Sequence, residues 1–514
     1  MAHVLAVDLG TGGPKVALVS DSGRVTASAF EPVTTSLLAG EGAEQDPEEW
    51  WSAITTASRR VMAEGGVAPG DVVGVGATAQ WSGTVAADEE GRPLRPAVIW
   101  MDARGAPAIT RQTGGALSVL GYDVRKLVRW VRLTGGVPGH SGKDPTAHIL
   151  WIRETEPDVY RATHKFLEPV DWLNQRMTGR FAASHDSITL HWVTDNRRIG
   201  AVAYDDTLLA MAGLERAKLP DLVPSATVMG RLTPAAAEAL GLAPGLPVAT
   251  GTGDLHSAAV GSGAVAPFDA HLYIGTSSWI SCHVPFKKTD ALRNVASIPA
   301  GLPDRYLVAD EHETAGACLT FLAGMLGEEP GGETYRRFDE IAASAPAGSH
   351  KVLFTPWLNG ERSPVDDHTI RGGFHNLSLA TVKADLVRAV YEGVALNSRW
   401  LLEAVDHFVG RRLERLAFIG GGANSDVWAQ IHADVTGRRI RPVADPVLAN
   451  VRGAGLLTLV ALGRVRAEDI PTMVEVRDSV DPDPAVRGVY DELFGEFVEL
   501  YKQTKAIHRR LNRH

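Results

Sequence analysis

The stretch Val7-Asp8-Leu9-Gly10-Thr11-Gly12-Gly13 and the stretch Tyr273-Ile274-Gly275-Thr276-Ser277-Ser278, half a chain later, decide the fold. Each follows an apolar segment that predicts a β-strand, and each leaves that strand through Gly-Thr and two more small residues. A turn of this kind exposes backbone N–H groups that bind phosphate oxygens. One such loop is weak evidence, whereas two of them predict two related domains that face one polyphosphate.

Length and composition limit the class of protein. A chain of 514 residues is too long for one hydrophobic core, so we expect two or three domains. The net charge of −10 argues against a nucleic-acid partner. No apolar run is long enough to span a membrane, and the chain enters a strand at once without a signal peptide. We therefore expect no membrane partner and a cytoplasmic location. Cys282 and Cys318 provide neither a disulfide framework nor a zinc site.

The order of predicted elements indicates the architecture. Three strands form an antiparallel meander before a helix and a buried strand, and these elements are predicted at 4–7, 15–19, 24–29, 47–64 and 71–76. A second meander, at 271–274, 279–284 and 305–308, restarts the same plan. The predicted fold class is α/β, with two actin-like or ribonuclease-H-like ATPase domains flanking an interdomain cleft.

The remaining elements complete this plan. They are a strand at 98–100, a helix-rich stretch at 105–245, a strand at 247–250, an amphipathic helix at 381–408, a strand at 416–419, an apolar helix at 454–462 and a helical tail at 484–512. We place the domain boundary near residue 265. The expected units are a first domain at 1–265, a second at 266–480 and a C-terminal tail at 481–514.

The first loop carries charged neighbours that suit phosphate chemistry. Asp8 ends the strand beside the loop, and a carboxylate next to phosphates is repulsive unless a cation intervenes, so its predicted role is to hold Mg²⁺. Lys15 would meet the terminal phosphate as a point charge. The alternative is that Asp8 caps the turn and Lys15 is a surface lysine. The residues expected to bind the phosphates of ATP are Gly10, Thr11, Gly12, Gly13, Gly275, Thr276 and Ser277.

A third loop, Gly420-Gly421-Gly422-Ala423-Asn424, follows a predicted strand and precedes a helix with Asn424 or Ser425 as its N-cap. Three glycines let a flat ring lie against bare backbone, so we expect Gly420, Gly421, Gly422 and Asn424 to bind adenine and ribose. The alternative is a tight strand-to-helix turn without a ligand.

Asp254, in Thr250-Gly251-Thr252-Gly253-Asp254, follows a predicted strand and would open the next helix. We expect the positive helix end to keep this carboxylate ionised. An ionised aspartate near two phosphate loops accepts the proton of an attacking hydroxyl, so Asp254 is the candidate catalytic base. A plain N-cap is the alternative.

Two further segments follow strands of the first domain and suit a polyol. They contain Gln80, Trp81 and Ser82, and Trp100, Asp102 and Arg104. An aromatic face packs against C–H groups, while a carboxylate and a guanidinium bind hydroxyls. The alternative is a surface ion pair between Asp102 and Arg104 beside a half-buried Trp100.

Together these pieces resemble the FGGY family of carbohydrate kinases. The resemblance is carried, in the family's order, by 8–15, 94–104, 171–179, 251–254, 274–278, 355–364 with 371–372 and 388–393, and 420–424. It implies a sugar held mainly by the first domain, Mg²⁺-ATP held mainly by the second, and Asp254 as the base. The spacing is most similar to the xylulokinase branch of the family.

One departure from that branch concerns the substrate. Xylulokinases carry Gln-Met-His where this chain has Gln80-Trp81-Ser82, and that segment touches sugar in the relatives. We therefore expect phosphoryl transfer to a substrate other than D-xylulose, or poor use of D-xylulose. In the first phosphate loop, Gly12-Gly13-Pro14 replaces the usual small hydroxyl residues, and Pro14 has no N–H.

The leading hypothesis is an ATP-dependent kinase that phosphorylates a small sugar or polyol. The alternatives are a kinase for glycerol, ribulose, gluconate or a tetritol, a sugar-responsive regulator that has lost turnover, and an actin-like chaperone or filament protein. The retention of Asp8 and Asp254 argues against a regulator, which needs neither. The natural sugar, the phosphorylated carbon and the oligomeric state stay open, with a homodimer as one candidate.

Overall fold

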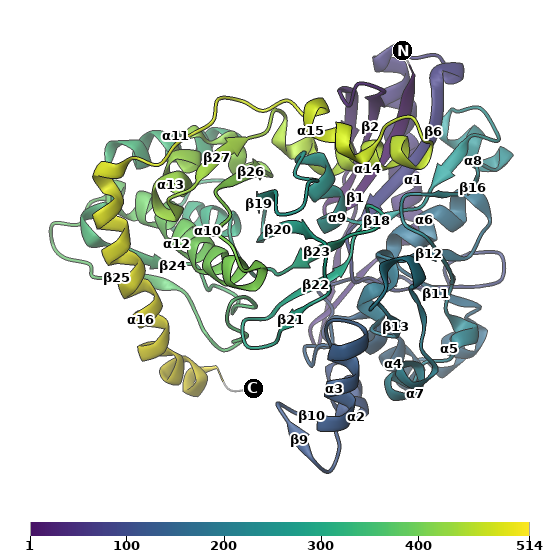
Figure 1. Cartoon of the computed structure of the whole chain (residues 1–514), viewed down its shortest axis with the longest axis horizontal. Coiled ribbons are helices and arrows are strands. Elements are labelled where there is room, and N and C mark those ends of the chain that lie inside the picture. Colours follow the sequence, from purple (N-terminus) through teal and green to yellow (C-terminus); the bar gives the residue numbers. More distant parts are fainter. Residues whose placement is uncertain (1, 513–514) are drawn as a thin grey trace.

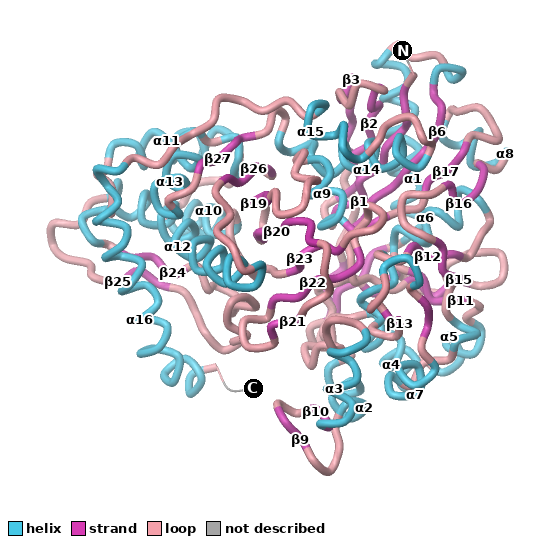
Figure 2. Tube along the Cα trace, viewed as in Figure 1, coloured by secondary structure: helices cyan, strands magenta, loops and turns pink. Residues whose placement is uncertain are grey.

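The two predicted meanders form the cores of two seven-stranded sheets in a computed structural model that describes residues 2–512 (Figures 1 and 2). The strands of the first sheet are β1 (His3–Gly10), β2 (Gly13–Ser20), β3 (Val25–Phe30), β6 (Val72–Ala79), β16 (Val228–Arg231), β17 (Pro247–Ala249) and β18 (Thr252–Gly253). Those of the second sheet are β19 (Ala270–Ile274), β20 (Ser278–Val284), β21 (Thr289–Asp290), β22 (Val295–Pro299), β23 (Tyr306–Ala309), β26 (Arg415–Ile419) and β27 (Arg439–Pro442).

The pairing of strands repeats between the two sheets. In the first sheet, β1 is antiparallel to β2 and parallel to β6. In the second, β19 is antiparallel to β20 and parallel to β26. Each phosphate loop therefore joins the first two strands of its meander. The predicted α/β fold with two related domains is confirmed.

The helices and the smaller strands have the following bounds. The helices are α1 (Pro47–Gly65), α2 (Ala106–Thr113), α3 (Val124–Leu133), α4 (Pro145–Thr155), α5 (Pro157–Ala162), α6 (Pro169–Thr178), α7 (Asp206–Ala212), α8 (Pro234–Leu240), α9 (Asp254–Gly261), α10 (Ala317–Met325), α11 (Gly332–Ser344), α12 (Lys383–Val409), α13 (Asp426–Thr436), α14 (Ala449–Ala461), α15 (Ile470–Met473) and α16 (Arg487–Leu511). The smaller strands are β4 (Ser36–Leu38), β5 (Gly42–Gln45), β7 (Val85–Ala87), β8 (Ala97–Val98), β9 (Ser118–Val119), β10 (Tyr122–Asp123), β11 (Lys165–Leu167), β12 (Ala182–Ser184), β13 (Thr194–Asp195), β14 (Ala203–Tyr204), β15 (Asp221–Val223), β24 (Leu353–Thr355) and β25 (Gly373–His375).

Most predicted elements lie within a few residues of their observed bounds, but one predicted strand is shorter and several observed strands were not predicted. The strand predicted at 98–100 ends early, at Val98, because the chain turns there and the Asp102 N–H donates to the Ile99 carbonyl at 2.9 Å. Strand β22 was not predicted, and it pairs with β23 in the second meander.

Two helices, α9 and α14, form a layer that both sheets share (Figure 1). One continuous hydrophobic cluster contains both helices together with residues of each sheet, among them Val4 and Val19 of the first and Leu307 and Ile419 of the second. Helix α14 follows the second-domain strands in sequence, yet it packs against β1, β2 and β6. The proposed domain boundary near residue 265 therefore divides the sequence, but α14, which follows this boundary, packs on the sheet of the first domain.

Small residues bring α9 and α14 into backbone contact. A Cβ added to Gly261 would overlap the carbonyl oxygen of Ala449, and one added to Gly453 would overlap the carbonyl oxygen of Ser257. Any side chain at these two glycines would force the helices apart.

A second set of contacts ties the domains through β21 to β23. Lys287 Nζ donates to the Val131 carbonyl at 2.9 Å, and Thr289 Oγ1 donates to the Gly135 carbonyl at 2.7 Å. Tyr306 OH donates to a carbonyl of the first domain as well, that of Asn196, at 2.9 Å. The two domains are therefore joined by these hydrogen bonds as well as by the packing of α9 and α14.

The proposed C-terminal tail packs on the second domain. Tyr490 and Phe497 of α16 are buried in that domain's core, and Tyr490 OH donates to Glu392 Oε1 of α12 at 2.8 Å. Residues 513–514 of the proposed tail lie outside the described residues.

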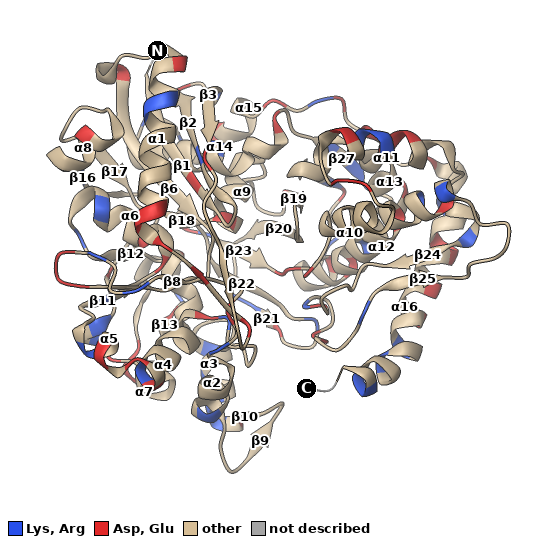
Figure 3. Cartoon of the chain, turned by 180° about the vertical axis from the view of Figure 1, so that it is seen from behind, with Lys and Arg blue, Asp and Glu red and all other residues tan. Residues whose placement is uncertain are grey.

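Acidic and basic residues are both spread over the two domains, as the coloured ribbon of Figure 3 shows. Among the described residues, none of the helices combines the length and apolar character that crossing a bilayer requires.

The contact between α9 and α14 leads to a stability prediction. Gly453→Ala should lower the free energy of unfolding by about 1–3 kcal/mol, because the new methyl group overlaps the Ser257 carbonyl. Urea denaturation followed by circular dichroism measures the effect. Gly495→Ala is the matched control, since Gly495 lies within α16 with open space around it and should gain stability. Equal stability of Gly453→Ala and wild type would contradict the proposed contact.

Candidate active site

The first phosphate loop is a tight turn between β1 and β2. Gly13 has a φ of 137°, and a Cβ there would overlap the Glu31 carbonyl, so this glycine is required by the turn itself. Gly12 is exposed and has no neighbour within reach of a Cβ. Within the described chain, the N–H groups of Thr11 and Gly12 donate to no acceptor. These two amides are available to phosphate oxygens, as predicted.

The second loop has the same property. The carbonyls of Gly275 and Thr276 accept from the N–H groups of Gly316 and Ala315 at 2.8 and 2.9 Å. In residues 2–512, the N–H groups of Thr276 and Ser277 have no acceptor. The loop is thus held by its carbonyls and presents its amides, which is the arrangement that an anion-binding loop needs.

The three glycines of the third loop divide into two roles. Gly420 has a φ of 84° and lies too close to the Ile274 carbonyl for a side chain, and Gly422 packs on the Ile274 side chain. Gly421 has open space instead and lines the pocket described below. Ser425, one of the two predicted N-caps, accepts from the Trp428 N–H at 3.0 Å and begins α13. Asn424 ends the preceding turn and is exposed.

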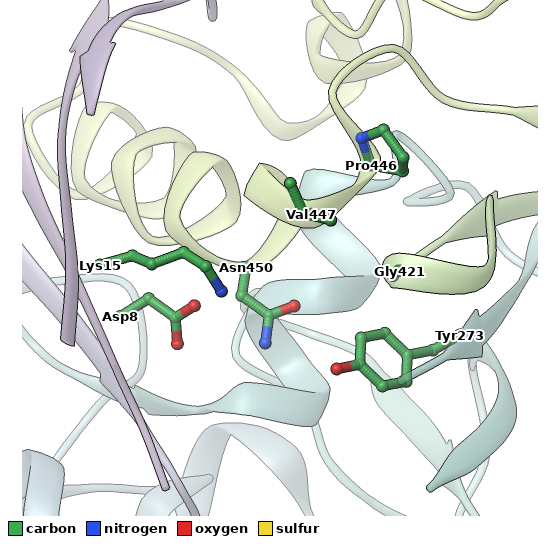
Figure 4. Close-up of a pocket in the computed structure, with 8 residues that line it drawn as sticks. Asp8, Lys15, Tyr273, Gly421, Pro446, Val447 and Asn450 are labelled. Carbon is green, nitrogen blue, oxygen red and sulfur yellow. The ribbon is translucent and has the colours of Figure 1, made fainter. Parts of the chain in front are cut away.

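A pocket between the two domains brings the first and third loops together (Figure 4). Its lining residues are Asp8, Lys15, Tyr273, Gly420, Gly421, Pro446, Val447 and Asn450. Asp8 and Lys15 come from the first sheet, Tyr273 from the second and Asn450 from the start of α14. The predicted metal ligand and the predicted phosphate-binding lysine therefore lie across a pocket from the predicted adenosine loop.

Asp8 and Lys15 face each other in the register of β1 and β2. Burial raises the pKa of the Asp8 carboxyl, and the charge of Lys15 offsets part of that rise. No group of three or more His, Cys, Asp or Glu side chains in the described chain could hold a metal ion. A Mg²⁺ ion at Asp8 would therefore complete its coordination with phosphate oxygens and water, which is its usual preference.

Asp254 opens α9, as predicted, and its Oδ1 accepts from the Leu255 N–H at 2.9 Å. We expected the positive helix end to keep this carboxylate ionised, and this expectation is wrong, because other effects on its pKa are larger. Burial, and then the charges of Asp8 and Glu311, raise its pKa to about 7. A carboxylate with this pKa is a stronger base near neutral pH than an ordinary aspartate.

Trp81 lies against the catalytic candidate. Its indole would collide with a Cβ at Gly253, the residue before Asp254, and its edge meets the His256 ring with centroids 5.0 Å apart. The indole N–H donates to the Ser187 carbonyl at 2.9 Å. Trp81 therefore offers the site a ring surface, while its polar atom is already bonded.

The neighbours of Trp81 are also bonded within the protein. Gln80 Nε2 donates to Gln45 Oε1 at 2.7 Å, and Ser82 Oγ donates to the Lys143 carbonyl at 2.8 Å. His148, a histidine of the helix-rich stretch, is also buried and contacts Thr84 Oγ1 and the Asp102 carbonyl.

Asp102 and Arg104 lie in a buried ion-pair cluster. The Asp102 carboxylate has no exposed surface, and it accepts from the Ala43 N–H at 2.8 Å and from Arg104 Nε at 2.9 Å. Arg104 also pairs with Glu44 and stacks on the Trp151 ring at 3.9 Å. The Asp102 carboxylate therefore has no free oxygen with which to make the predicted contact with substrate. The alternative, an ion pair between Asp102 and Arg104, is observed, although it is buried rather than on the surface.

The Thr11 side chain has a structural role that was not predicted. Its hydroxyl accepts from Trp100 Nε1 at 2.9 Å and donates to Gln80 Oε1 at 3.2 Å. The side chain therefore joins the two segments predicted to bind sugar, and only its backbone amide is free for phosphate.

Four residues of the pocket were not predicted from the sequence: Tyr273, Pro446, Val447 and Asn450. Tyr273 lies at the start of the second phosphate motif, but it was interpreted only as a residue of the preceding strand. Asn450 lies before the stretch predicted as an apolar helix, in the first turn of α14, which begins earlier than predicted, at Ala449.

Comparisons with known proteins agree with this geometry. Residues 3–261 match the model of the N-terminal domain of the FGGY family of carbohydrate kinases, and residues 271–462 match that of its C-terminal domain. Xylulose kinase of Escherichia coli (strain K12) is 30% identical over 516 residues, covering 97% of this chain and 98% of the relative. Xylulose kinase of Streptomyces rubiginosus is 31% identical over 468 residues, 88% of each chain. A solved structure described as a xyloylose kinase from Brucella ovis has a TM-score of 0.87 at 25% identity, covering 98% of this chain and all of its own.

The buried cluster around Asp102 generates a prediction that separates a structural role from sugar binding. Asp102→Ala should lower the free energy of unfolding by about 3–5 kcal/mol, because it removes one partner of a buried ion pair. The exposed pair Arg466–Asp469 supplies the control, and Asp469→Ala should leave stability nearly unchanged. Chemical denaturation compares the variants. A fully stable Asp102→Ala protein that loses only sugar affinity would restore the substrate-binding role.

Proposed function

The chain belongs to the FGGY family of carbohydrate kinases, and from that premise we propose that it transfers the γ-phosphoryl group of ATP to a hydroxyl of a small sugar. Membership and the xylulose kinase relatives make the protein a sugar kinase. The use of ATP and Mg²⁺, the base and the identity of the sugar belong to the proposal.

The observation that carries the proposal is the position of Asp254 relative to the phosphate loops. Asp8, at the first loop, is close enough to raise the pKa of Asp254. Asp8 also lines the pocket that the third loop closes. A hydroxyl held beside Asp254 would therefore lie next to the terminal phosphate of a nucleotide bound by these loops.

In this proposal, each group of residues has its own role in the phosphoryl transfer. Asp254 accepts the proton of the attacking hydroxyl, and its pKa near 7 leaves it ionised in a useful fraction of molecules at neutral pH. The free amides of the first two loops and the Lys15 ammonium stabilise the charge on the phosphoryl oxygens. Asp8 would hold Mg²⁺, which neutralises phosphate charge when bound.

The proposed substrate class is a xylulose-like ketose or a related polyol. The first-domain wall presents the Trp81 indole beside Asp254, and an indole face packs on the C–H groups of a sugar. An initial-rate assay of ADP release tests the function with D-xylulose, ribulose, glycerol, gluconate and tetritols as acceptors. Sugar-dependent ADP release with one of these acceptors is the expected result. No turnover with any acceptor, in a protein that binds sugar, would favour a sugar-responsive regulator.

The role of Asp254 leads to a prediction about pH. In the wild type, kcat/KM should fall as pH decreases through about 7, because the protonated carboxyl cannot accept the hydroxyl proton. Asp254→Asn should lower kcat by about two to four orders of magnitude and remove this acid limb. Asp304→Asn, on an exposed loop, is the control. Near-full kcat in Asp254→Asn would eliminate the proposed base.

The segment around Trp81 leads to a prediction about specificity. Trp81→Met with Ser82→His should raise kcat/KM for D-xylulose relative to the best wild-type substrate, because an imidazole returns a hydrogen-bond partner to a buried hydroxyl, a gain of about 1–3 kcal/mol. Ser82 has a φ of 67°, a conformation that histidine tolerates. Trp51→Met, on α1, is the control. Equal D-xylulose kinetics in wild type and double variant would contradict this prediction, as would efficient D-xylulose turnover by the wild type.

A further inference from the structure

Tyr273, near the end of β19, is held in place by its aromatic neighbours. Its ring stacks face to face on Trp279, with centroids 3.9 Å apart and planes 7° from parallel. Trp279 is in turn fixed, because its Nε1 donates to His271 Nε2 at 3.0 Å. Burial lowers the pKa of His271 to about 3, so that ring is neutral and accepts this bond. The Tyr273 ring is therefore stacked on an indole that a hydrogen bond to His271 holds in place.

The second loop lies directly over the Tyr273 hydroxyl. A Cβ at Gly275 would overlap the hydroxyl oxygen, so the absence of a side chain at Gly275 makes room for it. The glycine of the Gly-Thr motif thus serves a second purpose in this chain. It lets a tyrosine hydroxyl that lines the pocket lie directly beside the loop whose Thr276 and Ser277 amides donate to no acceptor in the described chain.

The Tyr273 hydroxyl points into the pocket. Figure 4 shows it directed across the pocket toward Asn450, with Lys15 and Asp8 beyond. In the described chain it makes no hydrogen bond, although most buried or half-buried tyrosine hydroxyls find one. Burial, and then the negative charges of Asp254 and Asp8, raise the pKa of Tyr273 above its ordinary value. The group is therefore a protonated donor throughout the physiological range.

The pocket walls carry different chemistry. The first-domain wall carries Asp8 and Lys15, while the side chains of Tyr273 and Asn450 line the pocket from the second-domain part of the chain. A terminal phosphoryl group between the walls exposes oxygens to both. A tyrosine O–H donor adds a directed hydrogen bond without adding a charge that would repel Lys15.

We propose that the Tyr273 hydroxyl binds the terminal phosphoryl group of the nucleotide and positions it for transfer, from the wall opposite Lys15. The inference rests on the proposed function, because it takes this pocket to hold the γ-phosphate of ATP. Tyr273 is a substrate-binding residue in this scheme and takes no part in proton transfer. The competing explanation is that Tyr273 only supports the second loop through its ring.

Tyr273→Phe separates these explanations, because phenylalanine keeps the stacked ring and removes only the donor. We expect the affinity for a nonhydrolysable ATP analogue with Mg²⁺ to fall about ten- to hundredfold, as for the loss of a hydrogen bond to a charged group. The affinity for ADP should change less than twofold, since ADP lacks the terminal phosphoryl group. Isothermal titration calorimetry measures both. In turnover, kcat should fall while KM for the sugar stays unchanged.

Two further variants complete the experiment. Tyr335→Phe removes a hydroxyl that bonds Thr320 on the surface, and it should bind both nucleotides as the wild type does. Tyr273→Ala removes the ring as well and should weaken ADP binding, because the loop above it loses its support. Wild-type affinities for both nucleotides in Tyr273→Phe would overturn the proposal and leave only the packing role. So would an equal loss for ADP and the analogue. A wild-type protein that binds neither nucleotide would refute the proposed function, and this inference with it.

Discussion

The backbone contact between α9 and α14 fixes where the parts of the site lie. Gly261 and Gly453 let the two helices touch without intervening side chains, and the same pair of helices fills the space between both sheets. Asp254 begins one of these helices, and Asn450 lies at the start of the other. Because a close-packed contact of this kind cannot be stretched or compressed without cost, the positions of base and pocket are set by the same interface that joins the domains.

The cleft concentrates acidic groups, and this controls its chemistry. Asp8, Asp254 and Glu311 each have a pKa raised by burial. Arg362 pairs with Glu311, and Lys15 lies opposite Asp8, so part of the acidic charge is balanced. Bringing phosphates into such a site adds negative charge to it. Cations must therefore enter with the nucleotide. Because the negative charge around Asp254 is only partly balanced, the pKa of Asp254 stays raised, which suits a proton acceptor.

Sequence reasoning succeeded where a role depends on the local backbone. The two Gly-Thr loops, the meanders and the helix start at Asp254 follow from residues within a few positions of each other. It did less well where partners are distant in sequence. Asp102 and Arg104 suggested a polyol site because they are adjacent, while the Glu44 and Trp151 side chains that complete their cluster come from other segments. The raised pKa of Asp254 likewise depends on Asp8, which is distant in the sequence, near the start of the first domain, but close in the structure.

Substrate choice follows from which polar atoms remain free. Gln80, Trp81 and Ser82 have used their hydrogen-bonding groups on Gln45, Ser187 and Lys143. What this segment presents beside Asp254 is an indole surface, which attracts the C–H face of a sugar but discriminates weakly among hydroxyls. Strong discrimination requires a buried polar group that is left unpaired by the wrong substrate, and this segment has none to leave unpaired. Selectivity at this wall therefore depends on shape and on the orientation of the attacking hydroxyl toward Asp254, so related ketoses and polyols of similar width compete for the same surface.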